Sequence, residues 1–118
     1  MSDRQIIPYT EIRLASVPSI YQFDFGDFTD YNSLSMHVNW SGLNAADAYV
    51  VMIVRQHSGA EWTRIEDLRF DMSAASGSCL LINREMVCTY GGIYVYKGAC
   101  TTGTLKIWTI PQTTTNGK

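Results

Sequence analysis

The residues of this chain that could perform acid–base or nucleophilic chemistry are few and lie far apart. The sequence has two histidines, His37 and His57. A nucleophilic hydrolase needs a serine or cysteine beside a histidine base that a carboxylate orients. No Gly-x-Ser-x-Gly motif supplies such a nucleophile. We interpret His37 as a polar-face strand residue and His57 as a turn residue, and we predict no catalytic residue and no enzymatic activity.

An acidic segment is the nearest feature to a metal site. Asp24, Asp27 and Asp30 recur at every third residue, and Ca²⁺ takes several oxygen ligands. The spacing differs from that of an EF-hand loop, in which acidic or amide residues alternate and a glutamate closes the loop. We therefore interpret the segment as a solvated acidic arm and predict no metal. The glycines at 91–92 and 98–103 precede no Gly-Lys-Ser/Thr, so we interpret them as turn residues and predict no cofactor.

The cysteines show neither a zinc-binding nor a disulfide pattern. Cys79, Cys88 and Cys100 give an odd count without a Cys-x-x-Cys pair. Each lies among small or apolar neighbours in the sequence. We expect free thiols that pack as small hydrophobic side chains.

Charge and hydropathy exclude several classes of partner. The 118 residues carry a net charge of −2 and no basic run, so we expect neither nucleic acid nor anionic membrane as a partner. No apolar stretch is long enough to span a bilayer, and the first residues do not resemble a secretory signal, so we expect synthesis in a cytoplasm. Charged residues make up only 17%, with seven tyrosines and three tryptophans. This composition is typical either of a surface that another protein covers or of a small β domain.

Strands must position the residues described above, because apolar and polar residues alternate along the chain with a period of two. In residues 33–40, apolar Leu34, Met36, Val38 and Trp40 alternate with polar residues, as in a half-buried strand. Residues 49–54 are apolar on both sides, which predicts a strand covered on both faces, with another chain as a candidate for the second cover. Further short strands are expected at 10–14, 19–25, 61–68, 79–82, 86–90, 93–96 and 104–110.

The pattern predicts an all-β fold of seven to nine short strands in an antiparallel, jelly-roll-like β-sandwich. Turns are expected at 41–47, 57–60, 71–78, 91–92 and 98–103, and Pro111 is expected to end the last strand because proline cannot donate to a ladder. We divide the chain into an N-terminal arm or first strands (1–30), the sandwich (31–111) and a polar C-terminal tail (112–118).

Aromatic residues outside the predicted core are the candidates for partner binding, because their rings offer large contact areas. Tyr94 and Tyr96 share one strand face, opposite Ile93 and Val95. The candidate partner-binding residues are Tyr9, Phe23, Phe25, Phe28, Tyr94 and Tyr96. The tryptophans and tyrosines could instead form a glycan-stacking platform, although Trp40 and Trp62 are expected to face inward.

The stretch from Ser33 to Ile110 resembles a small β-sandwich domain of tailed-bacteriophage virion proteins. That domain has an alternating strand ending in Trp, a strand leading to a Gly-x-x-Trp turn, an apolar strand, and a Tyr-rich strand before a Gly-Thr-Leu hairpin. The corresponding segments here are SLSMHVNWSG (33–42), VVMIVRQHSGAEWTRIEDL (50–68), SCLLI (78–82) and GGIYVYKGACTTGTLKIWTI (91–110). Two departures are Gln56-His57-Ser58-Gly59 in place of Ser-Asn-Asp-Gly, and Tyr96-Lys97 in place of an arginine.

The resemblance implies a structural part of a phage virion, such as a capsid decoration or auxiliary protein or a head-fibre component. It implies major capsid or other virion proteins as partners, and a homo-oligomer in which a trimer is favoured. The alternative function is a carbohydrate-binding β-sandwich module of a receptor-binding device.

Overall fold

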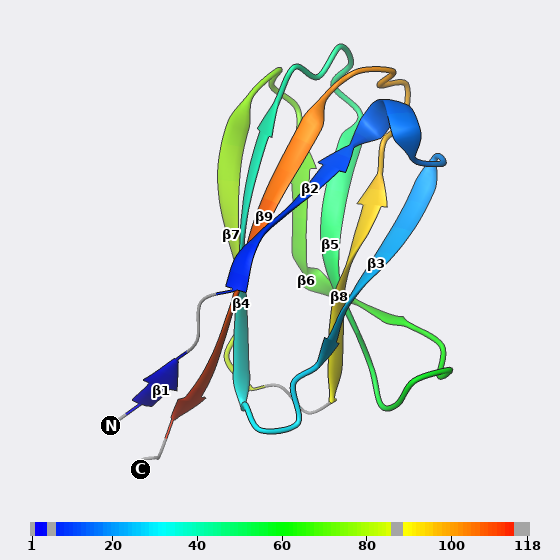
Figure 1. The fold of residues 1–118 in the computed structure, drawn as a ribbon. Helices are drawn as coiled ribbons and strands as arrows, with labels where there is room; N and C mark the ends of the chain where they lie inside the picture. Colours follow the sequence, from blue (N-terminus) through cyan, green and yellow to red (C-terminus); the bar gives the residue numbers. More distant parts are fainter. Residues whose placement is uncertain (1, 5–6, 86–88, 115–118) are drawn as a thin grey trace.

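Two antiparallel β-sheets face each other in the computed structural model (Figure 1). The structure describes residues 2–4, 7–85 and 89–114, and the side chains of residues 9–85 and 89–113. Within these ranges nine strands and one short 3₁₀ helix (η1, Leu14–Ser16) are present, and the strands confirm the predicted β-sandwich. No helix of the described residues is long and apolar enough to cross a membrane.

The first sheet, sheet A, has the order β1-β9-β4-β7, with β2 also pairing β9. Its strands are β1 (Ser2–Arg4), β2 (Ile7–Arg13), β9 (Thr104–Thr114), β4 (Ser33–Ser41) and β7 (Gly77–Asn83). The second, sheet B, has the order β3-β8-β5-β6. Its strands are β3 (Ile20–Asp27), β8 (Tyr90–Tyr96), β5 (Ala48–Arg55) and β6 (Thr63–Met72).

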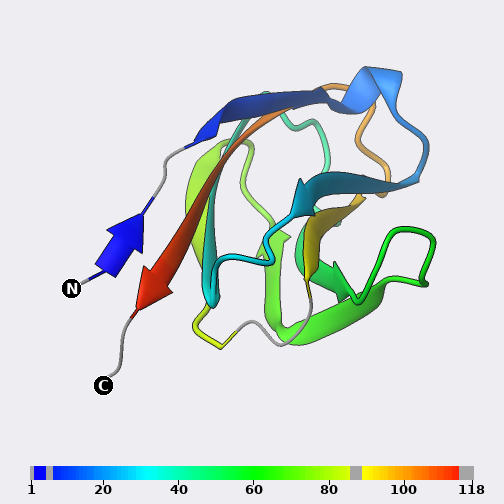
Figure 2. The same cartoon turned by 60° about the horizontal axis from the view of Figure 1, so that its bottom comes forward.

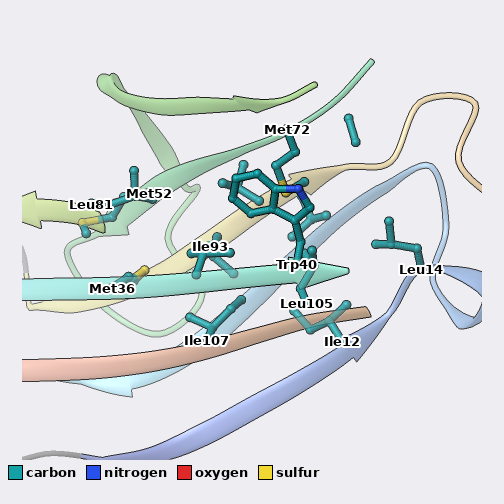
Figure 3. Close-up of a cluster of buried hydrophobic side chains, with 14 of the residues drawn as sticks. Ile12, Leu14, Met36, Trp40, Met52, Met72, Leu81, Ile93, Leu105 and Ile107 are labelled. Carbon is teal, nitrogen blue, oxygen red and sulfur yellow. The ribbon is translucent and has the colours of Figure 1, made fainter. Parts of the chain in front are cut away.

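The core lies between the sheets and is built by residues that alternate along each strand. On β4, Leu34, Met36 and Val38 are 0% exposed and Trp40 is 6% exposed, as the sequence predicts. All four belong to the core cluster, and Figure 3 shows two of them, Met36 and Trp40, in the same layer as residues of the opposite sheet such as Met52 and Ile93. Each fully buried aliphatic side chain contributes roughly 1.5–3 kcal/mol of burial free energy, so this layer is the main source of stability.

Three strands, β1, β2 and β3, lie within the described part of residues 1–30. β2 belongs to sheet A and β3 to sheet B, and η1 connects them. β1 pairs with the end of β9, Ser2 opposite Thr114, and this two-stranded ribbon projects away from the sandwich (Figures 1 and 2). The predicted polar tail therefore begins inside β9, and residues 115–118 lie outside the described residues.

The prediction that Pro111 ends the last strand is wrong, because β9 continues to Thr114. The carbonyl of Gln112 accepts the N–H of Asn32 at 3.2 Å, so the backbone N–H and C=O of residue 112 point toward β4. The backbone groups of residue 111 therefore point away from β4, toward the other side of β9, since hydrogen-bonding directions alternate along an antiparallel strand. On that side, the last described pair of β2 is at Thr109 and the first of β1 at Gln112. Proline thus occupies the break between two partner strands, where its missing N–H removes no described bond.

The prediction of a turn at Gly91-Gly92 is also wrong. Both glycines lie within β8, where Gly92 pairs with Asp24 of β3 and Ile53 of β5. A Cβ on Gly92 would lie 2.3 Å from the carbonyl oxygen of Phe23 and 3.1 Å from the Trp62 ring. Glycine is required here because a neighbouring backbone and an aromatic ring both approach closely. The expected strand at 86–90 includes residues 86–88, which lie outside the described residues.

The predicted loop 71–78 is shorter in the structure. β6 runs to Met72, whose side chain is fully buried, and β7 starts at Gly77. The run of small residues predicted a longer loop. Gly77 belongs to the strand instead, because packing requires a glycine there. A Cβ at this position would lie 2.6 Å from the Trp40 ring, so the indole packs over the glycine.

The remaining turn predictions are confirmed. The chain turns at 56–60 between β5 and β6, with Gly59 at a φ of 92°. The loop between β4 and β5 is hydrogen-bonded to the loop between β8 and β9. An Asp47 carboxylate oxygen accepts the N–H of Ala99 at 3.0 Å, and Asn44 Oδ1 accepts the N–H of Thr101 at 2.9 Å. These bonds fix the upper end of the sandwich, where the two loops meet.

The described cysteines are free thiols that contact the core. Cys100 is 1% exposed, and Cys79 on β7 is half-buried. Burial raises the pKa of the Cys79 thiol from 9.0 to about 11. Cys88 lies outside the described residues.

The raised pKa predicts a slow thiol at neutral pH. The thiolate is the reactive form, so at pH 8 we expect Cys79 to alkylate about a hundredfold more slowly than a thiol with a pKa of 9. Iodoacetamide labelling followed by peptide mass spectrometry measures this rate site by site. The rate at Cys79 is expected to keep rising up to about pH 11. A plateau near pH 9 in the folded protein would contradict the burial of this thiol.

Candidate partner-binding surfaces

The outer face of sheet B carries a layer of arginine and aromatic side chains. We call this the arginine–aromatic layer, and its members come from β5, β6, β8 and the β5–β6 hairpin. They are Arg55, Arg64, Arg69, Tyr49, Tyr90, Tyr94, Tyr96 and Trp62. Guanidinium groups and ring faces attract each other because the ring quadrupole is negative on its face.

Each of the three arginines in the layer lies over at least one aromatic ring. The guanidinium carbon of Arg55 lies 4.3 Å from the Trp62 ring centre, and that of Arg69 lies 3.8 Å from the Tyr49 ring centre. Arg64 lies over Tyr94 at 4.6 Å. Each guanidinium also contacts a carboxylate on its own sheet. These ion pairs are Arg55–Asp24 at 2.6 Å, Arg64–Glu66 at 2.9 Å and Arg69–Asp71 at 3.0 Å.

This layer covers the second apolar face of β5. Val51 and Ile53 point away from the main core, yet both are 0% exposed. Burial in the same cluster raises the pKa of the Tyr94 phenol above its usual value. The two-sided burial predicted for residues 49–54 is confirmed, but the chain itself provides the second cover. Trp62 belongs to this outer cover and not to the core, so its predicted inward position is wrong.

The outer face of sheet A carries a different feature, a row of large side chains across four strands. We call it the tryptophan row: Tyr9 of β2, Trp108 of β9, His37 of β4 and Leu80 of β7. Trp108 pairs with His37, and His37 pairs with Leu80. The Tyr9 and Trp108 ring centres are 5.1 Å apart, and those of His37 and Trp108 are 5.7 Å apart.

The two ends of the tryptophan row are exposed, and Lys106 Nζ lies over one of them, 5.3 Å from the Tyr9 ring centre. Tyr9 is 46% exposed and Leu80 is 55% exposed. Beside it lies a second cross-strand row of Ile110, Ser35 and Ile82, in which both isoleucines are half-buried. The outer face of a solvated sandwich sheet is usually polar. Adjacent apolar rows on such a face are typical of a surface that contacts another protein.

The six candidate partner-binding residues lie in different environments in the structure. Phe28 is 3% exposed, and Phe23 and Phe25 pack against the main core, so these three are chiefly packing residues. Tyr94 is 9% exposed and supports the arginine–aromatic layer with Tyr96. Tyr9 alone lies at a widely exposed position. Sequence reasoning missed Trp108, His37 and Leu80, because only the strand register brings them together.

Within the part of the chain that the structure describes, the histidines and the acidic segment lie apart. His37 lies in the tryptophan row, whereas His57 lies in the β5–β6 turn, where its Nδ1 is 2.8 Å from the Ser58 carbonyl oxygen. Asp24 pairs with Arg55, and Asp27 accepts the N–H of Thr29 at 2.8 Å. Among the described residues, no group of three histidines, cysteines or carboxylates could hold a metal ion.

The indole rings do not form a flat platform. Trp40 is 6% exposed and donates from Nε1 to the Ala74 carbonyl at 3.1 Å. Trp62 is stacked under Arg55, and Trp108 is tilted by 50° to Tyr9. Stacking of a sugar ring needs an open ring face, so this geometry favours contact with a protein over contact with a glycan.

Comparison with known proteins adds no relative. No protein-family model matches the chain, and no curated protein matches it. The geometry of the two outer faces therefore carries the functional argument.

Proposed function

We propose that this chain is a non-enzymatic structural protein of a bacteriophage virion. It binds capsid subunits or another virion protein as a decoration, auxiliary or head-fibre component. The tryptophan row is the contact surface, and its exposed apolar character is the single observation that carries the proposal.

The outer faces of the two sheets differ in how fully their apolar side chains are covered. The arginine–aromatic layer already covers Val51 and Ile53, the apolar residues beneath it on the outer face of sheet B. Sheet A leaves Tyr9 and Leu80 in solvent on either side of Trp108. Removing such apolar surface from water yields about 25 cal/mol per Å² before the costs of association are subtracted. A partner with a complementary apolar surface would therefore bind sheet A in preference to sheet B.

The virion assignment is supported by the resemblance of the strand motifs from Ser33 to Ile110 to a phage virion sandwich, and by the low charge content of 17%. A decoration protein stabilises a shell because it binds only the assembled state, which shifts the equilibrium by mass action. The projecting ribbon of β1 and β9 extends the same sheet beyond the sandwich, so it would lengthen a contact made through sheet A (Figure 2).

A binding assay with purified particles tests the proposal. Stripped particles of the phage that encodes the chain are mixed with wild-type protein and with Leu80→Asp, then sedimented. Leu80 is 55% exposed, so the substitution leaves the fold intact but places a charge in the row. We expect at least a tenfold loss of affinity, about 1.4 kcal/mol. Ser73→Asp adds the same charge on an exposed loop and is expected to bind like wild type.

Two outcomes count against the proposal. Equal binding of wild type and Leu80→Asp would remove the tryptophan row as the contact surface. No binding of the wild-type protein to any particle component would remove the virion function.

A further inference from the structure

The edges of the two sheets differ in how they are protected against pairing with another strand. Charged residues and proline on an edge strand discourage such pairing. β6 carries Arg64, Glu66, Asp67, Arg69 and Asp71, and β2 carries Pro8, Glu11 and Arg13. By contrast, neither residues 20–23 of β3 nor β7, the other edge of sheet A, contain a charge or a proline, and on β3 Ile20 is 52% exposed.

The backbone of β3 is regular over five residues and has one free side. Its pairs with β8 run without interruption from Ile20 opposite Tyr96 to Asp24 opposite Gly92, and the register shifts before Gly26. No described strand pairs with its other side. The Ser19 carbonyl accepts the N–H of Lys97 at 3.1 Å. Because bonding directions alternate, residues 19, 21 and 23 face β8, whereas the N–H and C=O groups of Ile20, Gln22 and Asp24 face outward.

A groove runs beside this free side, between β3 and β2. It has a volume of about 390 Å³, and its apolar lining is Ile12, Val17, Tyr21 and Phe23. Val17, Tyr21 and Phe23 are partly buried and pack against the main core. The groove is thus an open seam of the sandwich, and a strand added to β3 would place alternate side chains over it.

We propose that this seam is closed by a second copy of the chain, through antiparallel pairing of the two β3 strands about Gln22. Gln22 is the midpoint of the regular segment, so a two-fold axis there gives the longest ladder. Gln22 pairs with its counterpart, and Ile20 pairs with Asp24 of the other copy. Each of these pairs exchanges both backbone bonds, because all three residues face outward.

The same register explains why a second copy fits. It sets Tyr21 opposite Phe23 of the other copy, and the two-fold axis repeats this pair. Both pairs lie on the face of β3 that lines the groove. Aromatic cross-strand pairs stabilise a sheet. It also keeps the two Asp24 carboxylates from lying opposite each other, and each keeps its Arg55 partner on the outer face. The result is one continuous sheet B through both copies. Such an isologous contact closes at two copies, which differs from the trimer that the family resemblance implies.

Cross-linking tests this register directly. A Gln22→Cys variant is treated with a short bis-maleimide, and the linked peptides are identified by mass spectrometry. Paired residues on neighbouring strands have Cα atoms about 5.5 Å apart, so a 22–22 link is expected at high yield. Glu66→Cys is the matched control, because β6 is the other edge of sheet B, and no 66–66 link is expected. The native Cys79 reacts slowly, since its pKa is about 11.

Solution mass tests the association itself. One strand pair and two grooves make a small interface, so we expect a dissociation constant on the order of 10 µM. Light scattering should show a concentration-dependent rise from 13.2 kDa toward twice that mass. Gln22→Pro removes an outward N–H without touching the bonds to β8, and Gln22→Lys sets two like charges on the axis. Both variants are expected to be monomers with a wild-type circular dichroism spectrum.

The proposal is overturned by a wild-type protein that stays monomeric at about 1 mM, or by a dimer that both Gln22 variants leave intact. These measurements use the purified chain alone and involve β3 of sheet B. The proposed virion contact involves sheet A and particles, so either proposal can fail without the other.

Discussion

Trp40→Ala is expected to destabilise the protein by about 3–5 kcal/mol, the usual cost of removing a large aromatic side chain from a core. The indole is 6% exposed, packs over Gly77, and lies 5.5 Å from the Phe70 ring. Its removal also leaves the Ala74 carbonyl without its Nε1 donor. Chemical denaturation followed by circular dichroism measures the loss in the free energy of unfolding.

Trp108→Ala is the matched control, because it removes the same side chain from the neighbouring strand on the opposite face of sheet A. Trp108 is only half-buried, so its removal is expected to cost less than about 1.5 kcal/mol. Equal costs for the two substitutions would contradict the assignment of inner and outer faces.

Gly92→Ala is expected to cost about 2–4 kcal/mol, which is large for the addition of one methyl group. The new Cβ would lie 2.3 Å from the carbonyl oxygen of Phe23, so the ladder between β8 and β3 must shift. In an open turn the same substitution would cost little. Thermal or chemical unfolding therefore distinguishes a glycine inside β8 from a glycine in a turn.

A double-mutant cycle separates the two contacts of this position. Trp62→Ala removes the ring that lies 3.1 Å from the added Cβ, but leaves the Phe23 carbonyl in place. We expect most of the Gly92→Ala cost to persist in the Trp62→Ala background, since the backbone contact dominates. If the Gly92→Ala cost disappears in this background, the steric clash of the added Cβ is with the Trp62 ring alone.

The sandwich could be predicted because period-two alternation is a local property of the sequence. In β4, four inward residues alternate with polar ones, and burial follows that alternation. The positions of Gly92 and Pro111 could not be predicted in this way. Both residues are usual turn or end signals, and here each satisfies a constraint from a neighbouring strand that only the register reveals.

The candidate site was predicted only in part, because contact surfaces depend on which strands become neighbours. The apolar second face of residues 49–54 is visible in the sequence, but its cover comes from Trp62 and from arginines of β5 and β6. Trp108 and Leu80 are 28 residues apart and meet through His37 between them. Arginines usually indicate a solvated surface, so their packing over tyrosines has no simple sequence signal.

The proposal that this chain is a virion protein is tested most directly by cryo-electron microscopy of purified virus particles. We expect density for a sandwich of 45 × 29 × 24 Å on the virion, with Tyr9, Trp108 and Leu80 against a neighbouring protein. Particles that contain no such density, or a sandwich whose sheet A faces solvent, would contradict the account.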